Sequence, residues 1–222
     1  MTLAELIKEF RTITMDREAP YLFDSADVTA WLVEAEQEAC IRGRLLHESG
    51  NAAVCEIPIS AGQSQYPLHA ALYEVDYVGL TLPGSPDSRR IKLVSREWLD
   101  EHVQDWRERT GVPEYAIQND TSIRLVPKPD TTATLLLEGY RLPLRGLSNQ
   151  LASKPEIQPA HHRYLVYWAL QRAYSIPDSE TLDLGRADQA EADFARYFGA
   201  RPSSNLRRRT QEDGPHHVKA WV

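Results

Sequence analysis

The sequence has few cysteines and no long apolar run. Its 222 residues include only two cysteines, Cys40 and Cys55. Two isolated cysteines cannot build the disulfide framework of a small secreted domain, and such residues are usually buried and reduced. No apolar stretch approaches the roughly 18 residues that a membrane-spanning helix needs. The chain also starts as an amphipathic helix and not as a charged and then apolar leader, so we expect neither a signal peptide nor a membrane partner.

An excess of positive charge is also absent. The chain carries 25 Lys and Arg against 32 Asp and Glu, which gives a formal net charge of -7. Tight non-specific DNA binding comes mainly from Lys and Arg that neutralise phosphates. The one basic run, Arg207-Arg208-Arg209, lies in a polar tail. We therefore expect no tight binding of DNA. The 42% hydrophobic content is ordinary for a globular protein and supports a core without disulfides or metals.

Residue patterns typical of enzymes and metal sites are missing as well. The adjacent His161 and His162 would point about 100° apart on a helix, so they could not share a metal as residues four apart do. A polar face at a helix start, or an interface, explains them better. His216-His217 lies in the tail without the Cys or carboxylate residues that would complete a metal site.

Several acidic residues near the end of the chain could be paired catalytic acids. They are Asp183, Asp188, Glu191 and Asp193. A catalytic acid pair needs a cleft and a shifted pKa, whereas these acids fall on the outer side of an amphipathic helix and suit a solvated face. The sequence contains no phosphate-binding glycine loop, nucleophile elbow or Cys-x-x-Cys motif. We predict that the protein is not an enzyme, with no catalytic residue, cofactor or metal.

Helical periodicity dominates both ends of the chain. Thr2 and Glu5 form a capping box that predicts a helix from Leu3. A second helix is expected from Asp24 or Ser25 to about Gly50, with the Glu and Arg residues between its apolar positions facing water. Near the other end, apolar patterns predict helices at 159–174 and 184–198, the second with Leu184, Ala187, Ala190, Phe194 and Phe198 on one face and Gly199 as its cap.

The middle of the chain has the short alternating runs and turn residues of strands. Expected strands lie at 54–59, 73–82, 91–94, 114–118, 122–126 and 132–140. One helix interrupts them, with Ser95 as its N-cap and Gly111 at its end. The fold class is therefore α+β: terminal helices at 1–51 and 144–200 form a bundle, 52–143 is a β-rich insertion with one helix, and 201–222 is an extended C-terminal tail.

The order of these segments resembles that of phage head-to-tail adaptor proteins. The resemblance rests on a strand, glycine turn and Tyr near Pro at 57–68, on Gly-Val-Pro-Glu-Tyr at 111–115 followed by the strand and Pro-Lys-Pro at 122–129, on the strand at 135–143, and on the helix at 159–174. It covers roughly residues 21–198. The chain is similar to the adaptors that join portal and tail in podophages, including gatekeeper-type connector proteins.

This resemblance implies a structural role in the virion, at the head-tail interface, after assembly in the host cytoplasm. It implies a ring of twelve subunits that binds the portal protein on one side and tail nozzle or tail tube proteins on the other. Double-stranded DNA would pass through the lumen during genome ejection without tight binding, which suits an acidic chain. The alternatives are a tail terminator or nozzle subunit, an assembly chaperone and, less favoured, a tail-associated wall hydrolase.

The tail supplies the candidate binding residues. Ordering its backbone costs roughly 1–2 kcal/mol per residue, while burial of Trp221 returns only about 4–6 kcal/mol. We therefore expect the tail to become ordered only on a partner. By resemblance to adaptors whose C-terminal extension reaches the portal, that partner is the portal protein. The residues expected to dock are Arg207, Arg208, Arg209, Val218, Trp221 and Val222.

Overall fold

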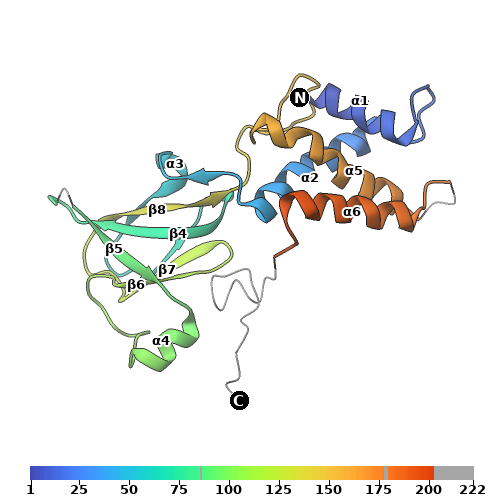
Figure 1. Ribbon diagram of the computed structural model, residues 1–222. Coiled ribbons are helices and arrows are strands. Elements are labelled where there is room, and N and C mark those ends of the chain that lie inside the picture. The colour runs from blue at the N-terminus through green and yellow to red at the C-terminus, as the bar shows by residue number, and fades with distance from the viewer. Residues whose placement is uncertain (86, 178–179, 203–222) are drawn as a thin grey trace, which may run out of the picture. The chain divides into compact units, whose positions relative to one another are not determined.

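The computed structural model describes residues 1–85, 87–177 and 180–202 and has a mixed α+β fold, as the sequence predicts. It divides into two compact units (Figure 1). The helical unit contains Met1–Leu46 and Leu142–Arg201, and the sheet unit contains His47–Arg141. The chain thus enters the sheet unit from the first pair of helices and returns to complete the helical unit.

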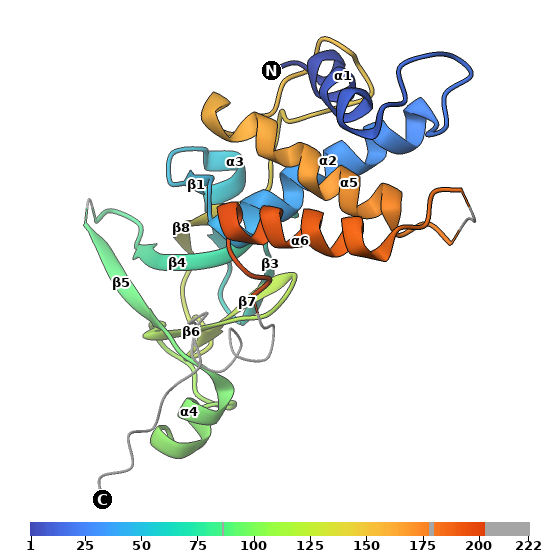
Figure 2. The same ribbon diagram turned by 45° about the vertical axis from the view of Figure 1, so that its right-hand side comes forward.

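The helical unit packs its helices around one hydrophobic cluster. Its elements are α1 (Leu3–Thr14), α2 (Ser25–Gly43), the 3₁₀ helix η1 (Pro159–Tyr164), α5 (Leu165–Tyr174) and α6 (Leu184–Phe198). The most apolar of them, α5, packs against α1, α2 and α6 (Figure 2). Its central place follows from its composition, because a helix that is apolar nearly all round must be covered on several sides.

Local capping signals set several helix ends as expected. The Thr2 hydroxyl accepts a hydrogen bond from the Glu5 backbone N–H at 3.3 Å, and the Glu5 carboxylate accepts one from the Thr2 N–H at 2.9 Å. The Asp24 carboxylate caps α2 through the Ala26 N–H at 2.6 Å. Gly199 ends α6 with a φ of 101°, a left-handed value that glycine adopts without strain.

The expectations for α2 were wrong in two respects. The helix ends at Gly43 and not near Gly50, because Arg44 takes the left-handed conformation with a φ of 48°. Its Glu36, Glu38 and Arg42 do not face water but are buried. Arg42 donates to Glu38 at 2.9 Å and to Glu191 of α6 at 2.7 Å. These ion pairs compensate the loss of hydration that burial imposes on charged groups.

The sheet unit is built on a curled sheet. Its strands are β1 (His47–Glu48), β2 (Glu56–Ile59), β3 (Gln65–Pro67), β4 (Leu72–Thr81), β5 (Ser88–Leu93), β6 (Tyr115–Gln118), β7 (Ser122–Val126) and β8 (Ala133–Arg141). They follow the order β1-β8-β4-β5-β6-β7-β3, with β2 also paired to β8. All of these pairs are antiparallel except that of β5 with β6. Buried residues of the strands, together with Val54 and Cys55, form a second hydrophobic cluster.

Two short helices of the sheet unit differ from expectation. Val54 and Cys55 belong to α3 (Ala52–Cys55) and not to a strand, because the Asn51 side chain caps a helical turn there through the Ala53 N–H at 3.2 Å. Ser95 caps α4 (Arg96–His102) as predicted, but α4 ends well before Gly111. Trp106 lies beyond the helix and is still buried, with Leu99, against Ile117 and Val126 of β6 and β7.

Candidate interaction surface

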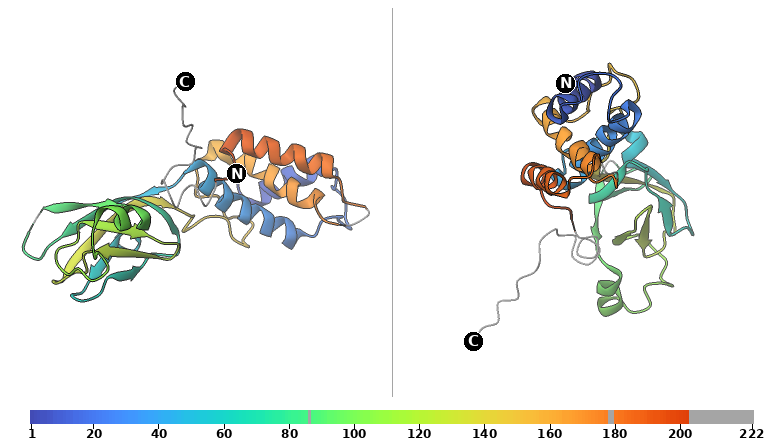
Figure 3. Two further views of the ribbon diagram at one scale, coloured as in Figure 1. Left: turned by 90° about the horizontal axis from the view of Figure 1, so that it is seen from below. Right: turned by 90° about the vertical axis from the view of Figure 1, so that its right-hand side faces the viewer.

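Exposed apolar side chains gather on the helical unit. Among the described residues, all nine large hydrophobic side chains that are exposed belong to it. Six of them lie at the ends of α1 and α6 or in the loops beside them: Ile13, Met15, Tyr21, Leu22, Leu182 and Leu184. The α1–α2 and α5–α6 connections lie at the same end of the unit (Figure 3). We call these six residues the loop-end surface.

One of these six side chains contradicts the sequence prediction. Leu184 was expected on the buried face of α6, but it is 63% exposed, while Ala187, Ala190, Phe194 and Phe198 are buried as predicted. Leu184 is the first residue of the helix, and the residues of α6 that are buried begin one turn later, at Ala187. Exposed apolar side chains that lie close to one another are typical of a contact surface.

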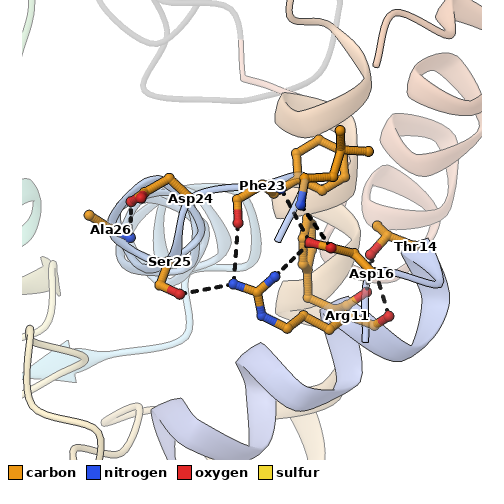
Figure 4. A network of polar contacts seen from close by, with 9 residues as sticks. Arg11, Thr14, Asp16, Phe23, Asp24, Ser25 and Ala26 are labelled. Carbon is orange, nitrogen blue, oxygen red and sulfur yellow. Dashed lines mark hydrogen bonds and ion pairs between the residues drawn. The ribbon is translucent and has the colours of Figure 1, made fainter. Parts of the chain in front are cut away.

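A buried ion pair holds the α1–α2 loop in place (Figure 4). The Arg11 guanidinium donates to the Asp16 carboxylate at 2.6 Å, and the two side chains are only 9% and 5% exposed. The same guanidinium donates to the Phe23 carbonyl at 3.2 Å and to the Ser25 hydroxyl at 2.9 Å. Arg11 therefore joins the end of α1 to the start of α2 across the whole loop.

The Asp16 side of this ion pair makes further hydrogen bonds to the loop. The Asp16 carboxylate accepts hydrogen bonds from the backbone N–H groups of Leu22 at 2.9 Å and Phe23 at 3.2 Å. The Tyr21 ring lies 3.6 Å from the Arg11 guanidinium carbon and covers it. Removing two charges from water is costly, and only such additional hydrogen bonds compensate that cost. The result is a fixed loop that presents Met15 and Leu22 to solvent.

The loop also has an acidic balance. Apart from the Arg11–Asp16 pair, residues 15–27 carry three exposed carboxylates and one exposed guanidinium, a net charge of -2: Glu18, Asp24 and Asp27 against Arg17. Within the described ranges, Glu18 and Asp27 have no ion-pair partner in the structure. Their charges are therefore available to a partner.

A hollow lies at the opposite end of α1. The segment that follows Leu142 is held against the start of α1, since Leu3 N–H donates to the Ser153 carbonyl at 2.8 Å and Ala4 N–H to the Leu151 carbonyl at 3.1 Å. Between this segment and α2 is a hollow of about 460 Å³. Its lining includes Val33, Glu36, Pro143, Leu144, Arg145 and Lys154. Leu144 is 39% exposed at the hollow and Leu151 is 62% exposed beside it.

Glu36 shapes the floor of this hollow. Its carboxylate accepts hydrogen bonds from the backbone N–H groups of Leu147 at 2.7 Å and Glu156 at 2.6 Å. Burial raises the pKa of the Glu36 carboxyl, and these backbone hydrogen bonds oppose that rise. A side chain at Gly146 would place its Cβ 2.4 Å from a Glu36 carboxylate oxygen, so the close approach requires glycine.

The two candidate histidines have separate environments. His161 lies 3.1 Å from the Tyr197 hydroxyl, on an exposed side of the unit. His162 is buried instead of belonging to a polar face: its Nε2 donates to the Ile157 carbonyl at 2.9 Å, and its Nδ1 lies 2.6 Å from the Met1 nitrogen. Desolvation by burial lowers the pKa of His162. Both contacts suit a neutral imidazole that fixes the loop near the start of α1.

Other groups weighed for chemistry have structural contacts. Asp183 caps α6 through the Arg186 N–H at 3.0 Å, Asp193 pairs with Arg196 at 2.7 Å, and Glu191 pairs with Arg42. Cys40 and Cys55 are buried and form no disulfide with each other, and burial raises the pKa of the Cys55 thiol. Within the described residues, no group of three or more His, Cys, Asp or Glu could hold a metal ion. Nor does any helix there have the length and apolar character to cross a membrane.

The sequence prediction of a docking tail lies outside the described residues. This holds for all six residues expected to dock: Arg207, Arg208, Arg209, Val218, Trp221 and Val222. The described chain approaches this segment at Arg201, whose guanidinium lies 3.5 Å from the Glu38 carboxylate. Sequence reasoning missed the loop-end surface, although Met15, Tyr21 and Leu22 are unusually apolar for residues around a proline-containing loop.

Comparison with protein families gives a match over nearly the whole chain. No curated protein matches the sequence. A family model described as SU10 adaptor protein matches residues 1–219. This match spans both units, so it covers the loop-end surface, the hollow and the whole curled sheet. The chain therefore belongs to the SU10 adaptor protein family, a family of phage head-tail adaptor type.

Proposed function

We propose that the protein is a structural head-tail adaptor that forms a ring between the portal and the tail of a tailed phage. The observation that carries this proposal is the family match over residues 1–219. The exposed apolar side chains of the helical unit support it, because a protein whose role is to join others needs contact surfaces. The ring and its expected twelve subunits come from the resemblance of the sequence to podophage adaptors.

The proposed ring forms part of the DNA channel. The net charge of -7 favours a channel wall that lets DNA pass, because tight non-specific binding needs many Lys and Arg contacts to phosphates. Catalysis has no place in this proposal. Three of the four acidic side chains that a hydrolase might have used have structural contacts: Asp183 caps α6, and Glu191 and Asp193 form ion pairs with arginines.

The tail of the chain is the proposed portal contact. Trp221 with Val218 and Val222 would enter an apolar pocket of the portal protein, and Arg207, Arg208 and Arg209 would meet acidic groups at its rim. The test compares portal binding by the full chain, by Trp221→Ala and by a chain ending at Asn205. Both changes should weaken binding to purified portal rings. Equal affinity of all three chains would place the portal contact elsewhere on the protein.

Composition of the particle tests the adaptor role independently of the tail. The chain should be present in purified virions by mass spectrometry, in an amount close to that of the portal protein. Its presence in infected cells but absence from mature particles would favour the assembly chaperone over the adaptor.

A further inference from the structure

We propose that the loop-end surface of one copy packs into the hollow of a second copy. The proposal rests on the ring of the proposed function and names the contact that builds it. Together these two sites account for eight of the nine exposed large hydrophobic side chains of the described residues. Six form the loop-end surface, Leu144 lines the hollow, and Leu151 lies beside it, next to the lining residue Gln150.

The two sites have complementary charge. The loop carries the exposed carboxylates of Glu18 and Asp27, which have no ion-pair partner within the described chain. The rim of the hollow carries Arg145 and Lys154, both exposed and likewise without an ion-pair partner among the residues described. The lining of the hollow contains one further charged residue, Glu36, which is buried, so the exposed charges of the lining are those of Arg145 and Lys154.

The two sites also differ in shape. The loop is held by the Arg11–Asp16 network, so Met15 and Leu22 need little ordering when they meet a partner. The hollow has a volume of about 460 Å³, and its lining combines the apolar Val33, Pro143 and Leu144 with polar and charged side chains. A loop that is already held in place loses little conformational freedom when it binds such a hollow, which is the usual advantage of preorganised contact surfaces.

The positions of the two sites favour a ring. They lie at opposite ends of α1, a helix of 12 residues and thus about 18 Å long. Contact between two different surfaces of the same chain is heterologous, and each added copy leaves one free loop end and one free hollow. Such a contact closes into a ring when its rotation allows, whereas a self-complementary patch would stop at a dimer.

Cross-linking between two tagged chains tests the pairing directly. One chain carries Leu22→Cys and the other Leu144→Cys, and the natural Cys40 and Cys55 are buried. A disulfide forms only when the two Cα atoms come within about 7 Å. Under mild oxidation of the concentrated mixture, the dominant cross-linked dimer should join the Leu22→Cys chain to the Leu144→Cys chain. Dimers of one chain with itself, or no more cross-linking than with the exposed control Thr131→Cys, would overturn the proposal.

Charge reversal tests the same contact without cysteine. Arg145→Glu with Lys154→Glu in one chain, and Glu18→Lys with Asp27→Lys in another, should each weaken self-association by about tenfold, or about 1.4 kcal/mol. Mixing the two chains should restore association, because an acidic loop then meets a basic hollow and a basic loop meets an acidic one. Failure of the mixture to recover, with both chains folded by circular dichroism, would contradict the pairing.

The two proposals can fail separately. A loop-to-hollow cross-link in a protein that is absent from virions would support the subunit contact and reject the adaptor role. Presence in virions at the level of the portal, with no such cross-link, would support the adaptor role and place the subunit contact on another surface.

Discussion

The Glu36 carboxylate accepts a 2.7 Å hydrogen bond from the backbone N–H of Leu147, a residue 111 positions further along the chain. This bond joins the middle of α2 to the segment that returns from the sheet unit. Together with the bond from Glu156 N–H at 2.6 Å, it fixes the floor of the hollow. The hollow is therefore built by two parts of the sequence that lie on either side of the sheet unit.

Replacement of Glu36 should show how much this contact contributes. Glu36→Gln keeps the size of the side chain but places an amide NH₂, which cannot accept, against backbone donors. We expect the free energy of unfolding in urea to fall by about 1–3 kcal/mol. The matched control is Glu34→Gln on the same helix, whose exposed pair with Arg172 should contribute less than about 1 kcal/mol. A loss for Glu36→Gln as small as the one expected for the control would mean that the Glu36 contacts contribute little.

The loop-end network predicts a larger effect at Asp16. Asp16→Asn removes the negative charge from a pair in which both side chains are almost fully buried. Because the Arg11 guanidinium then remains buried without a counter-charge, unfolding free energy should fall by about 3–5 kcal/mol. The control Asp193→Asn breaks a pair with Arg196, a side chain that is 72% exposed, and should cost less than about 1 kcal/mol. Amide hydrogen exchange should also rise at Leu22 and Phe23 in the Asp16 variant, and unchanged protection there would contradict the role of this residue.

His162 makes the stability of the helical unit depend on pH. Burial lowers the pKa of the folded His162, so its contribution is present above the ordinary His pKa of about 6.5 and is lost as pH falls through the folded value. The free energy of unfolding should therefore decrease as the pH falls through about 6.5, and His162→Gln should flatten that decrease. Parallel pH profiles for the natural chain and the variant would show that another group is responsible.

The sequence predicted the parts of the fold that neighbouring residues determine. Four helix ends are set by contacts within a few positions, so local patterns identify them directly. Thr2 with Glu5, Asp24 and Ser95 cap the starts of helices, and Gly199 caps the end of one. Strands β4, β6, β7 and β8 also lie within one or two residues of the expected ranges. At Val54 and Cys55 the preference of these residue types for strands gave a wrong prediction, because the two residues belong to a one-turn helix.

Contacts between distant positions explain what the sequence could not predict. The pattern around Glu38 and Arg42 predicted a solvated helix face, but Arg42 donates a hydrogen bond to Glu191, 149 positions away in the sequence. Glu36 had the same polar pattern and is buried by backbone donors of the returning segment. Neither site of the proposed subunit contact is visible in a local motif, because the loop depends on the Arg11–Asp16 pair and the hollow on the meeting of α2 with residues 143–154.

The most direct measurement of the adaptor role is electron microscopy of the purified chain mixed with purified portal rings of the same phage. Alone, the chain should sediment as a monomer or small oligomer, since its proposed subunit contact is partly polar and small. With the portal present, images should show an added ring of density, with the symmetry of the portal, on its tail-facing end. A portal that stays bare at saturating concentrations of folded chain would contradict the adaptor function.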